Sequence, residues 1–419
     1  MRDKSSFAPM FIIGVLFFIF GFVTWLNGSL IPFLKIILDL NDFEALFVTF
    51  AFYISYTVMA LPMASLLEKT GYKNGMAIGL GVMAVGSLLF IPSALMANYG
   101  LFLLALFTLG TGLTILQTAS NPYIVLIGPL KSAAMRISVM GLVNKSAGVL
   151  APLVFTALIF SGIGSTENLS TLETEDLALR LVTPYIAMTL VLISLIAFVK
   201  LSSLPELAFK TDSADNKSIF SYPRVVLGAL ALFFYVGVEV IAGDTIGLYA
   251  QNIGLINATA LTSYTMAFMV MGYLVGVFFI PKFISQEKAL VGSSIFGILL
   301  IVGVVFSSTT SHSISQILWG WSAVATLPNS VTFVALLGLS NALVWPTIWP
   351  LALEGLGKNT AKGSALLIMA ISGGAILPLA FGKISQLSAD MQTSYLLGIL
   401  CYLFILFYAL KWRKMNSWS

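Results

Sequence analysis

Twelve apolar stretches of about 20 residues each recur along this 419-residue chain, and they constrain its fold more than any other feature. A helix rises about 1.5 Å per residue, so a stretch of this length crosses the roughly 30 Å hydrocarbon core of a bilayer. In lipid every backbone polar group must be paired within the chain, which favours helices. The stretches cover residues 10–32, 44–66, 75–96, 100–127, 138–161, 182–204, 222–248, 260–285, 289–306, 328–352, 363–385 and 392–412. The sequence therefore predicts an all-α integral membrane protein with twelve transmembrane helices.

The composition excludes a soluble protein with a large core. Only 9% of the residues are charged and 58% are hydrophobic, whereas about a quarter of the residues in a soluble domain are charged. The mean hydropathy of +0.99 agrees. The polar start, MRDKSSF, precedes no small-residue cleavage site, so we expect the first stretch to be a retained helix rather than a removed signal peptide. The single cysteine, Cys401, excludes an internal disulfide and a cysteine-based metal site.

The distribution of Lys and Arg predicts the orientation in the membrane. With the N-terminus inside, 17 of the 21 Lys and Arg fall in cytoplasmic segments and three in outer segments. This bias predicts that both termini are cytoplasmic. Because it also accounts for the net charge of +4, we infer no nucleic-acid partner from the basic balance. Residues 307–328 are either an external loop or an interfacial helix.

Two halves of the sequence match each other. The longest polar internal segment, residues 204–224, separates six apolar stretches from six more. We therefore predict six-helix bundles at 1–204 and 224–419, joined by a cytoplasmic linker at 205–223. The matched pairs are Gln117/Pro122 with Asn341/Pro346, and Gly148/Pro152 with Gly374/Pro378, at offsets of 224 and 226 residues. Two parallel six-helix halves are the architecture of the major facilitator fold.

The link between the second and third stretches supports this fold. It carries Glu68, Lys69, Gly71 and Lys73, and it resembles the D-R-x-G-R-K loop of major facilitators, although Ala64 stands where that motif begins with Gly. An ion pair there would stabilise one of two alternating conformations. The alternative is an ordinary basic loop. We also expect Pro122 to kink or loosen its helix and so assist the motion.

Polar side chains inside the apolar stretches predict a shared aqueous cavity, because an unpaired polar group in hydrocarbon is costly. Carboxamides donate and accept hydrogen bonds, as sugar hydroxyls require, and Trp and Tyr offer flat faces for the C–H side of a sugar ring. Asn121, which precedes Pro122, more simply caps freed backbone. The alternative for each amide is a hydrogen bond between helices. The predicted substrate-binding residues are Asn27, Gln117, Asn144, Asn341, Trp345 and Tyr235, with Trp25 close to Asn27 in sequence.

Three charged residues lie within the stretches, and we predict that Lys145, Glu239 and Asp244 couple transport to an ion. Lys145 lies about 12 Å inside its helix at 1.5 Å per residue, near the limit of its reach to the surface. Glu239 is deep. Asp244 lies near the outer end of its stretch, where we expect it to be solvated.

Four segments carry a resemblance to a known family: GFVTWLNGSLIPFLK, LQTASNPYIV, FFYVGVEV, and the run from Asn341 to Pro378. Together they resemble the fucose–galactose–glucose–proton symporters of the major facilitator superfamily, especially the bacterial glucose/galactose and N-acetylglucosamine permease branch. The resemblance spans nearly the whole chain. It implies the major facilitator fold and a multi-pass location in a bacterial inner membrane. It also implies a hexose substrate (glucose, galactose, mannose or N-acetylglucosamine) and coupling to Na⁺ or H⁺.

The sequence departs from the fucose-type pattern at two carboxylates. That pattern has an acid directly after the Asn of the first stretch, where this chain has Gly28, and a Glu where this chain has Gln117. Neither Gly nor Gln titrates. One hypothesis is that Glu239, opposed by Lys145, is the coupling group. The other is that Lys145 replaces the coupling cation and the protein is a facilitative uniporter.

Other functional classes fit less well. An enzyme would need a catalytic cluster, but the chain has one histidine, His312, and no HExxH or GxSxG motif. A channel would need a repeated filter-like sequence, which is absent. A sensor that has lost transport would be distinguished by uptake assays. We expect no cofactor and no metal site, a lipid bilayer and a small hexose as partners, and a monomer.

Overall fold

The computed structural model describes residues 7–127, 133–161, 174–205, 218–255, 258–280, 283–356, 359–415 and 417–418, and it contains helices and no strands within those residues. Twelve helical segments in this part of the chain are long and apolar enough to cross a membrane, which confirms the predicted fold class. Most of the predicted linker, residues 206–217, lies outside the described residues.

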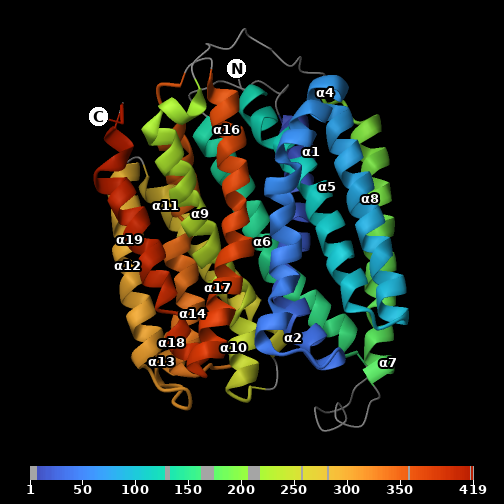
Figure 1. Ribbon diagram of the computed structural model, residues 1–419, viewed down its shortest axis with the longest axis vertical. Helices are drawn as coiled ribbons and strands as arrows, with labels where there is room; N and C mark the ends of the chain where they lie inside the picture. The colour runs from blue at the N-terminus through green and yellow to red at the C-terminus, as the bar shows by residue number, and fades with distance from the viewer. Residues whose placement is uncertain are drawn as a thin grey trace.

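The helices stand side by side in a single bundle (Figure 1). In the first half they are α1 (Phe7–Trp25), α2 (Asn27–Ile37), α3 (Asp42–Ala45), α4 (Phe47–Leu95), α5 (Tyr99–Leu126), α6 (Ala133–Ile159), α7 (Thr174–Leu179) and α8 (Val182–Leu201). In the second half they are α9 (Pro223–Asp244), α10 (Ile246–Asn252), α11 (Thr262–Phe279), α12 (Gln286–Phe306), α13 (Ser313–Trp319), α14 (Asn329–Asn341), α15 (Val344–Leu353), α16 (Thr360–Met369), α17 (Gly373–Ser388), α18 (Met391–Ser394) and α19 (Leu397–Leu410).

The start of α1 and the end of α19 lie at the same end of the bundle (Figure 1). We call this end the terminal face and the opposite end the distal face. At the terminal face, α4 contains two spans that join at Gly71, whose backbone has φ 77°. This left-handed conformation favours glycine because it has no Cβ. Residues 307–328 at the distal face form the short helix α13 and irregular chain, so the segment is partly a loop and partly a helix.

In each half, glycines allow one pair of helices to pack closely, and the two pairs are equivalent: α1 with α6 in the first half, and α9 with α17 in the second. A methyl group at position 21 of α1 would lie 1.9 Å from the backbone oxygen of Asn144 in α6, and one at position 373 of α17 would lie 1.8 Å from that of Phe233 in α9. In the same way, Gly148 packs on Trp25 of α1, and Gly374 packs on Val240 of α9. Small residues allow such close approach between membrane helices. The sequence repeat at Gly148 and Gly374 thus corresponds to the same contact in each half.

The two halves meet along α4 with α17 and along α6 with α11. Most hydrogen bonds between the halves, within the described residues, lie near the distal face. The Ser29 hydroxyl donates to the Thr259 carbonyl oxygen at 2.6 Å, and the Ser263 hydroxyl donates to the Val149 carbonyl oxygen at 2.7 Å. The Thr57 hydroxyl of α4 donates to the Met369 carbonyl oxygen of α16 at 3.0 Å. The described structure is therefore closed at the distal face.

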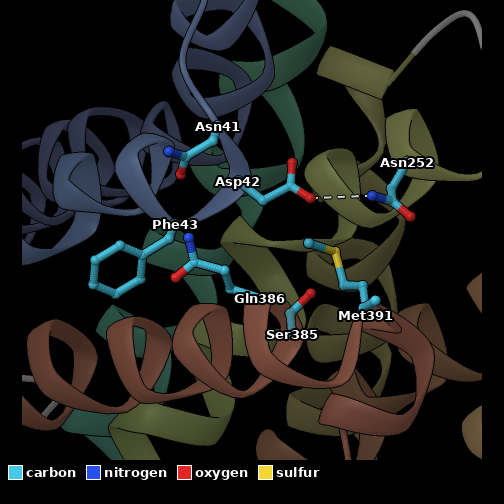
Figure 2. Close-up of a pocket in the computed structure, with 8 residues that line it drawn as sticks. Asn41, Asp42, Phe43, Asn252, Ser385, Gln386 and Met391 are labelled. Carbon is cyan, nitrogen blue, oxygen red and sulfur yellow. Dashed lines mark hydrogen bonds between the residues drawn. The ribbon is translucent and has the colours of Figure 1, made fainter.

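The ion-paired residue Asp42 contributes to the contact between the halves at the distal face. One oxygen of Asp42 pairs with Lys35, and the other accepts a hydrogen bond from Asn252 of the second half at 3.1 Å (Figure 2). Asp42 and Asn252 line a surface cavity of about 230 Å³. Its lining also includes Asn41, Phe43, Ser385, Gln386 and Met391. Asp42 thus links the start of α3 in the first half to the end of α10 in the second half.

Candidate substrate cavity

A cavity of about 120 Å³ lies between the two halves, and it reaches from the middle of the bundle toward the terminal face. Its polar and charged members come from α1, α4, α5, α6, α9 and α11, and most of the other lining residues are aromatic. The lining residues are Phe17, Phe20, Thr24, Trp25, Tyr53, Tyr56, Gln117, Asn121, Gly141, Asn144, Lys145, Tyr235, Val236, Glu239, Tyr273, Trp345 and Ile371.

Two of the predicted carboxamides project into this cavity. The Gln117 side chain, on α5, donates a hydrogen bond to the Tyr56 hydroxyl of α4 at 2.9 Å. The Asn144 side chain, on α6, donates to the Phe17 carbonyl oxygen of α1 at 3.3 Å. Each amide keeps its carbonyl oxygen and one N–H for another partner. These are the groups that a polyhydroxylated ligand needs.

An ion pair crosses the cavity between the halves. Lys145 Nζ of α6 lies 2.6 Å from Glu239 Oε1 of α9, and both side chains are at most 10% exposed. The same ammonium stands 4.3 Å from the centre of a Trp25 ring. A cation held by a carboxylate and an aromatic face is stabilised in a place where an isolated charge would be costly. Lys145 is therefore fixed in the cavity and does not extend to the membrane surface.

Aromatic rings form the wall on the side of the second half. Tyr235 lies one helical turn before Glu239 on α9, and its ring centre is 6.3 Å from that of Trp345. Trp345 in turn stacks on Trp349, with ring centres 5.2 Å apart. Flat rings beside polar groups suit an amphipathic ligand such as a sugar.

Two predicted binding residues do not line the cavity. Asn341 is fully buried at the end of α14, where its side-chain oxygen accepts a hydrogen bond from the Tyr402 hydroxyl at 2.7 Å. Asn27 is 1% exposed at the start of α2, and its side-chain nitrogen has no hydrogen-bond partner in the described part of the chain. The repeat pairs Asn341 with Gln117 in sequence, but their side chains have different surroundings because Tyr402 engages only Asn341.

The expectation that Asp244 is solvated is wrong. The residue ends α9 near the distal face, but its side chain is 0% exposed. Neither carboxylate oxygen has a hydrogen-bond partner among the described residues. The reason is the distal closure, which packs α2 and α11 over this end of α9. The position of Asp244 in the sequence predicts that it lies near the distal end of its span, but it does not predict its burial by α2 and α11.

Three of the predicted gating residues, Glu68, Lys69 and Gly71, lie at the terminal face and are not among the residues that line the cavity. Glu68 and Lys69 are exposed, and neither takes part in any of the four ion pairs found within the described residues. Lys73 donates a hydrogen bond to the Ser202 carbonyl oxygen at 2.8 Å, which ties the link to the end of α8. Position 122 lies within the continuous helix α5.

Several cavity residues were not predicted from the sequence. Tyr53 and Tyr56 of the second span and Tyr273 of α11 all line the cavity. The sequence feature that indicates them is the spacing of Tyr53 and Tyr56, which are three residues apart and therefore on one helix face. Their span has no charged residue between Glu44 and Glu68. The hydroxyl of Tyr56 accepts a hydrogen bond from Gln117, so this tyrosine contributes a polar group to the cavity.

Comparison with known proteins identifies the family. A model of the Major Facilitator Superfamily matches residues 13–378. The chain belongs to the Major Facilitator Superfamily. Because this superfamily consists of transporters, this facilitator is not an enzyme.

Curated relatives of this facilitator match it over nearly their whole length. It is 34% identical to a glucose/galactose transporter of Brucella abortus, over 96% of this chain and 93% of that protein. It is 27% identical to the L-fucose-proton symporter of Escherichia coli, over 99% of this chain and 95% of that protein.

Solved structures share its fold. The facilitator aligns with the transporter FucP in the outward conformation with a TM-score of 0.74 and 26% identity, covering 98% of this chain and 100% of FucP. A D-xylose-proton symporter aligns with a TM-score of 0.69 at 15% identity, which indicates the shared fold alone.

Proposed function

We propose that this facilitator carries a hexose across a bacterial inner membrane by alternating access, driven by Na⁺ or H⁺. The observation that carries the proposal is the cavity between the halves, which holds two carboxamides, an ion pair and stacked aromatic rings. A hexose needs donors and acceptors around its ring and an apolar surface against its C–H face. Relatives named as glucose/galactose transporters support the substrate class.

Gln117 and Asn144 are the proposed hydroxyl-binding residues, and Tyr235 and Trp345 supply the apolar surface. Because Gln117 and Asn144 belong to the first half and the aromatic pair to the second, a bound sugar would contact both halves. Asn27 and Asn341 would support the helix breaks next to the cavity rather than touch the sugar. This arrangement allows a ligand to favour one relative position of the halves.

The closed distal face supports alternating access, which requires a conformation closed at one face. In this proposal the terminal face lies in the cytoplasm. The excess of Lys and Arg in the links at the terminal face favours that orientation. In the described conformation the cavity would then release sugar to the cytoplasm. Glu68 and Lys69 form no ion pair within the described residues, so their proposed ion pair would form in the opposite conformation, when the terminal face closes.

Ion coupling is favoured by the Lys145–Glu239 pair, which joins α6 of one half to α9 of the other. A proton or Na⁺ that competes for the carboxylate would weaken the bridge, and sugar binding could thereby depend on the ion. The same observation also supports a second candidate, a facilitative uniporter in which the fixed Lys145 ammonium replaces the coupling cation.

Uptake into proteoliposomes tests the proposal. Labelled glucose, galactose, mannose, N-acetylglucosamine and L-fucose are offered with and without Na⁺, and with and without a protonophore. We expect counterflow exchange of at least one hexose, and accumulation that collapses when the driving gradient is removed. Exchange without accumulation under any gradient would favour the uniporter. Failure to exchange any of these sugars would contradict the proposed function.

A further inference from the structure

The carboxylate of Asp244 is the one charged group in the described spans that is both fully buried and unpartnered. Its side chain is 0% exposed, and neither oxygen has a hydrogen-bond partner in the part of the chain that the structure describes. An ionised carboxylate in such surroundings is strongly disfavoured, whereas a protonated carboxyl is not. Lys145 and Glu239 avoid this problem by pairing with each other.

The position of Asp244 strengthens this preference. It is the last residue of α9, before the break that leads into α10. A helix C-terminus carries partial negative charge, which further opposes a second negative charge there. Discontinuous membrane helices in transporters commonly place ion-binding groups at such breaks. The corresponding first span of the other half also breaks near the distal face, between α1 and α2.

The backbone carbonyl oxygens at this end of α9 each already accept a hydrogen bond from a threonine hydroxyl. The hydroxyl of Thr245 donates to the carbonyl oxygen of residue 241 at 2.6 Å, that of Thr265 to residue 242 at 3.1 Å, and that of Thr262 to residue 243 at 2.7 Å. A metal cation needs several oxygen ligands at once. A proton needs only the carboxylate, so the surroundings favour a proton over Na⁺.

The distal closure separates Asp244 from the distal solution. A methyl group at position 28 would lie 2.1 Å from the Thr262 hydroxyl and 3.1 Å from the Gly243 carbonyl oxygen, so α2 and α11 press directly on this helix end. The ring of Trp25 packs against Gly243 on the cavity side. When the distal face opens, these contacts must separate, and Asp244 then meets water.

Three ionisable groups act on Asp244 electrostatically: Glu239 on its own helix, Lys145 on α6, and Tyr53 on α4. Glu239 opposes a negative charge on Asp244 and Lys145 favours it. Because Lys145 and Glu239 neutralise each other in the sealed conformation, neither leaves a net charge that would hold Asp244 ionised. Glu239 lies five residues earlier on α9, about 7.5 Å nearer the cavity.

We propose that Asp244 is the residue that carries the coupling proton. This inference rests on the proposed function and specifies its driving ion. With the distal face open, the carboxylate takes a proton from water and forms an O–H bond. Closure then buries the neutral acid. After the terminal face opens, the O–H bond breaks, the proton passes to water in the cavity and the carboxylate is restored in that step. Reopening of the distal face then exposes the carboxylate to water for the next cycle.

Proteoliposomes containing wild type or Asp244→Asn test the assignment with two separate readouts. Counterflow of labelled glucose, galactose, mannose, N-acetylglucosamine and L-fucose needs no ion gradient and tests the hexose function. A pH-sensitive dye in the lumen measures proton movement that accompanies sugar. Asp39→Asn is the matched control, because Asp39 is an exposed acid at the distal face with φ 50°, a conformation that Asn tolerates.

We expect Asp244→Asn to exchange sugar within about threefold of wild type, to show no sugar-dependent proton movement and to give an accumulation ratio near one. Asp39→Asn should match wild type in all three measurements. Proton movement that survives in Asp244→Asn, or wild-type uptake that depends on Na⁺ and moves no protons, overturns the assignment but leaves the hexose function standing. Absence of exchange in wild type overturns both.

A variant that retains an acid covers the case in which Asp244→Asn loses exchange as well. Asp244→Glu keeps a titratable carboxyl at the same position. Recovery of both exchange and proton movement in Asp244→Glu supports the assignment. Recovery of exchange without proton movement overturns it, as does recovery of neither.

Discussion

At the scale of single residues, Gln117 makes the most direct proposed contact with the sugar. Its amide bonds to the Tyr56 hydroxyl and leaves one donor and an acceptor facing the cavity. We expect Gln117→Ala to weaken hexose affinity about 5- to 30-fold, because one or two hydrogen bonds contribute about 1–2 kcal/mol. Concentration dependence of counterflow measures this. The control is Gln316→Ala, an exposed carboxamide on α13; equal affinity in the two variants would leave Gln117 as a packing residue.

The Lys145–Glu239 pair makes a second prediction at this scale. Glu239→Gln leaves the Lys145 ammonium buried without its carboxylate, which we expect to lower the free energy of unfolding by about 3 kcal/mol. The double variant Lys145→Met/Glu239→Gln removes both charges and should recover much of that loss. Thermal unfolding of the purified protein in detergent measures both. Additive losses in the double variant would show that the two residues do not act as a pair.

Sequence reasoning located some of these residues and missed others for physical reasons. Gln117, Asn144, Lys145 and Glu239 share a cavity, as expected of polar groups that lipid would not accept. Asn341 has the same chemistry but finds its partner within the bundle, in Tyr402. Which partner a buried amide takes depends on the rotation and spacing of neighbouring helices, which a single sequence does not specify.

At the scale of helices, the contact between α2, α9 and α11 controls the distal closure. Ala at position 28 would bring its methyl group within 2.1 Å of the Thr262 hydroxyl. Overpacking of this kind costs about 1–3 kcal/mol, so we expect Gly28→Ala to reduce the closed population and slow transport at least fivefold. Gly292→Ala in α12 is the control, because nothing lies within 4 Å of the added methyl group. Similar transport rates in the two variants would contradict this role for Gly28.

The distal bridge of Asp42 and Asn252 predicts a smaller effect on the same closure. Asn252→Ala removes one exposed hydrogen bond between the halves, worth about 1 kcal/mol, and should raise the distal-open population about fivefold. Thiol labelling of a Ser385→Cys reporter in the distal cavity follows this change. The background is low because the single native thiol, Cys401, is buried. An unchanged labelling rate would exclude the bridge from the closure.

The order and number of the spans could be predicted from the sequence, because each span must satisfy its backbone and match the bilayer. Breaks within spans were harder to predict. The first span breaks at Leu26 and the seventh at Thr245, although the sequence runs through both as a continuous apolar stretch. Burial of Asp244 follows from the second break and from the closure above it. Both depend on contacts between halves that are far apart in the chain.

At the scale of the whole molecule, helices from the two halves of the chain enclose one cavity and contact one another at the distal face. The described conformation is sealed at the distal face and joined across the cavity by Lys145 and Glu239. FucP, a protein of the same superfamily, has been solved in the outward conformation. Opening the distal face of this chain would require the Ser29, Ser263 and Asn252 hydrogen bonds to separate together, which makes the halves the moving units.

Access to the cavity from each side of the membrane tests the central claim most directly. An Asn121→Cys variant, at a lining position outside the proposed sugar contacts, is placed in oriented proteoliposomes. It is treated with a membrane-impermeant maleimide, added either outside or inside, with and without hexose. Alternating access around a shared sugar cavity predicts labelling from both sides, and slower labelling when hexose is bound. Labelling from one side only, or at a rate that no hexose changes, would contradict it.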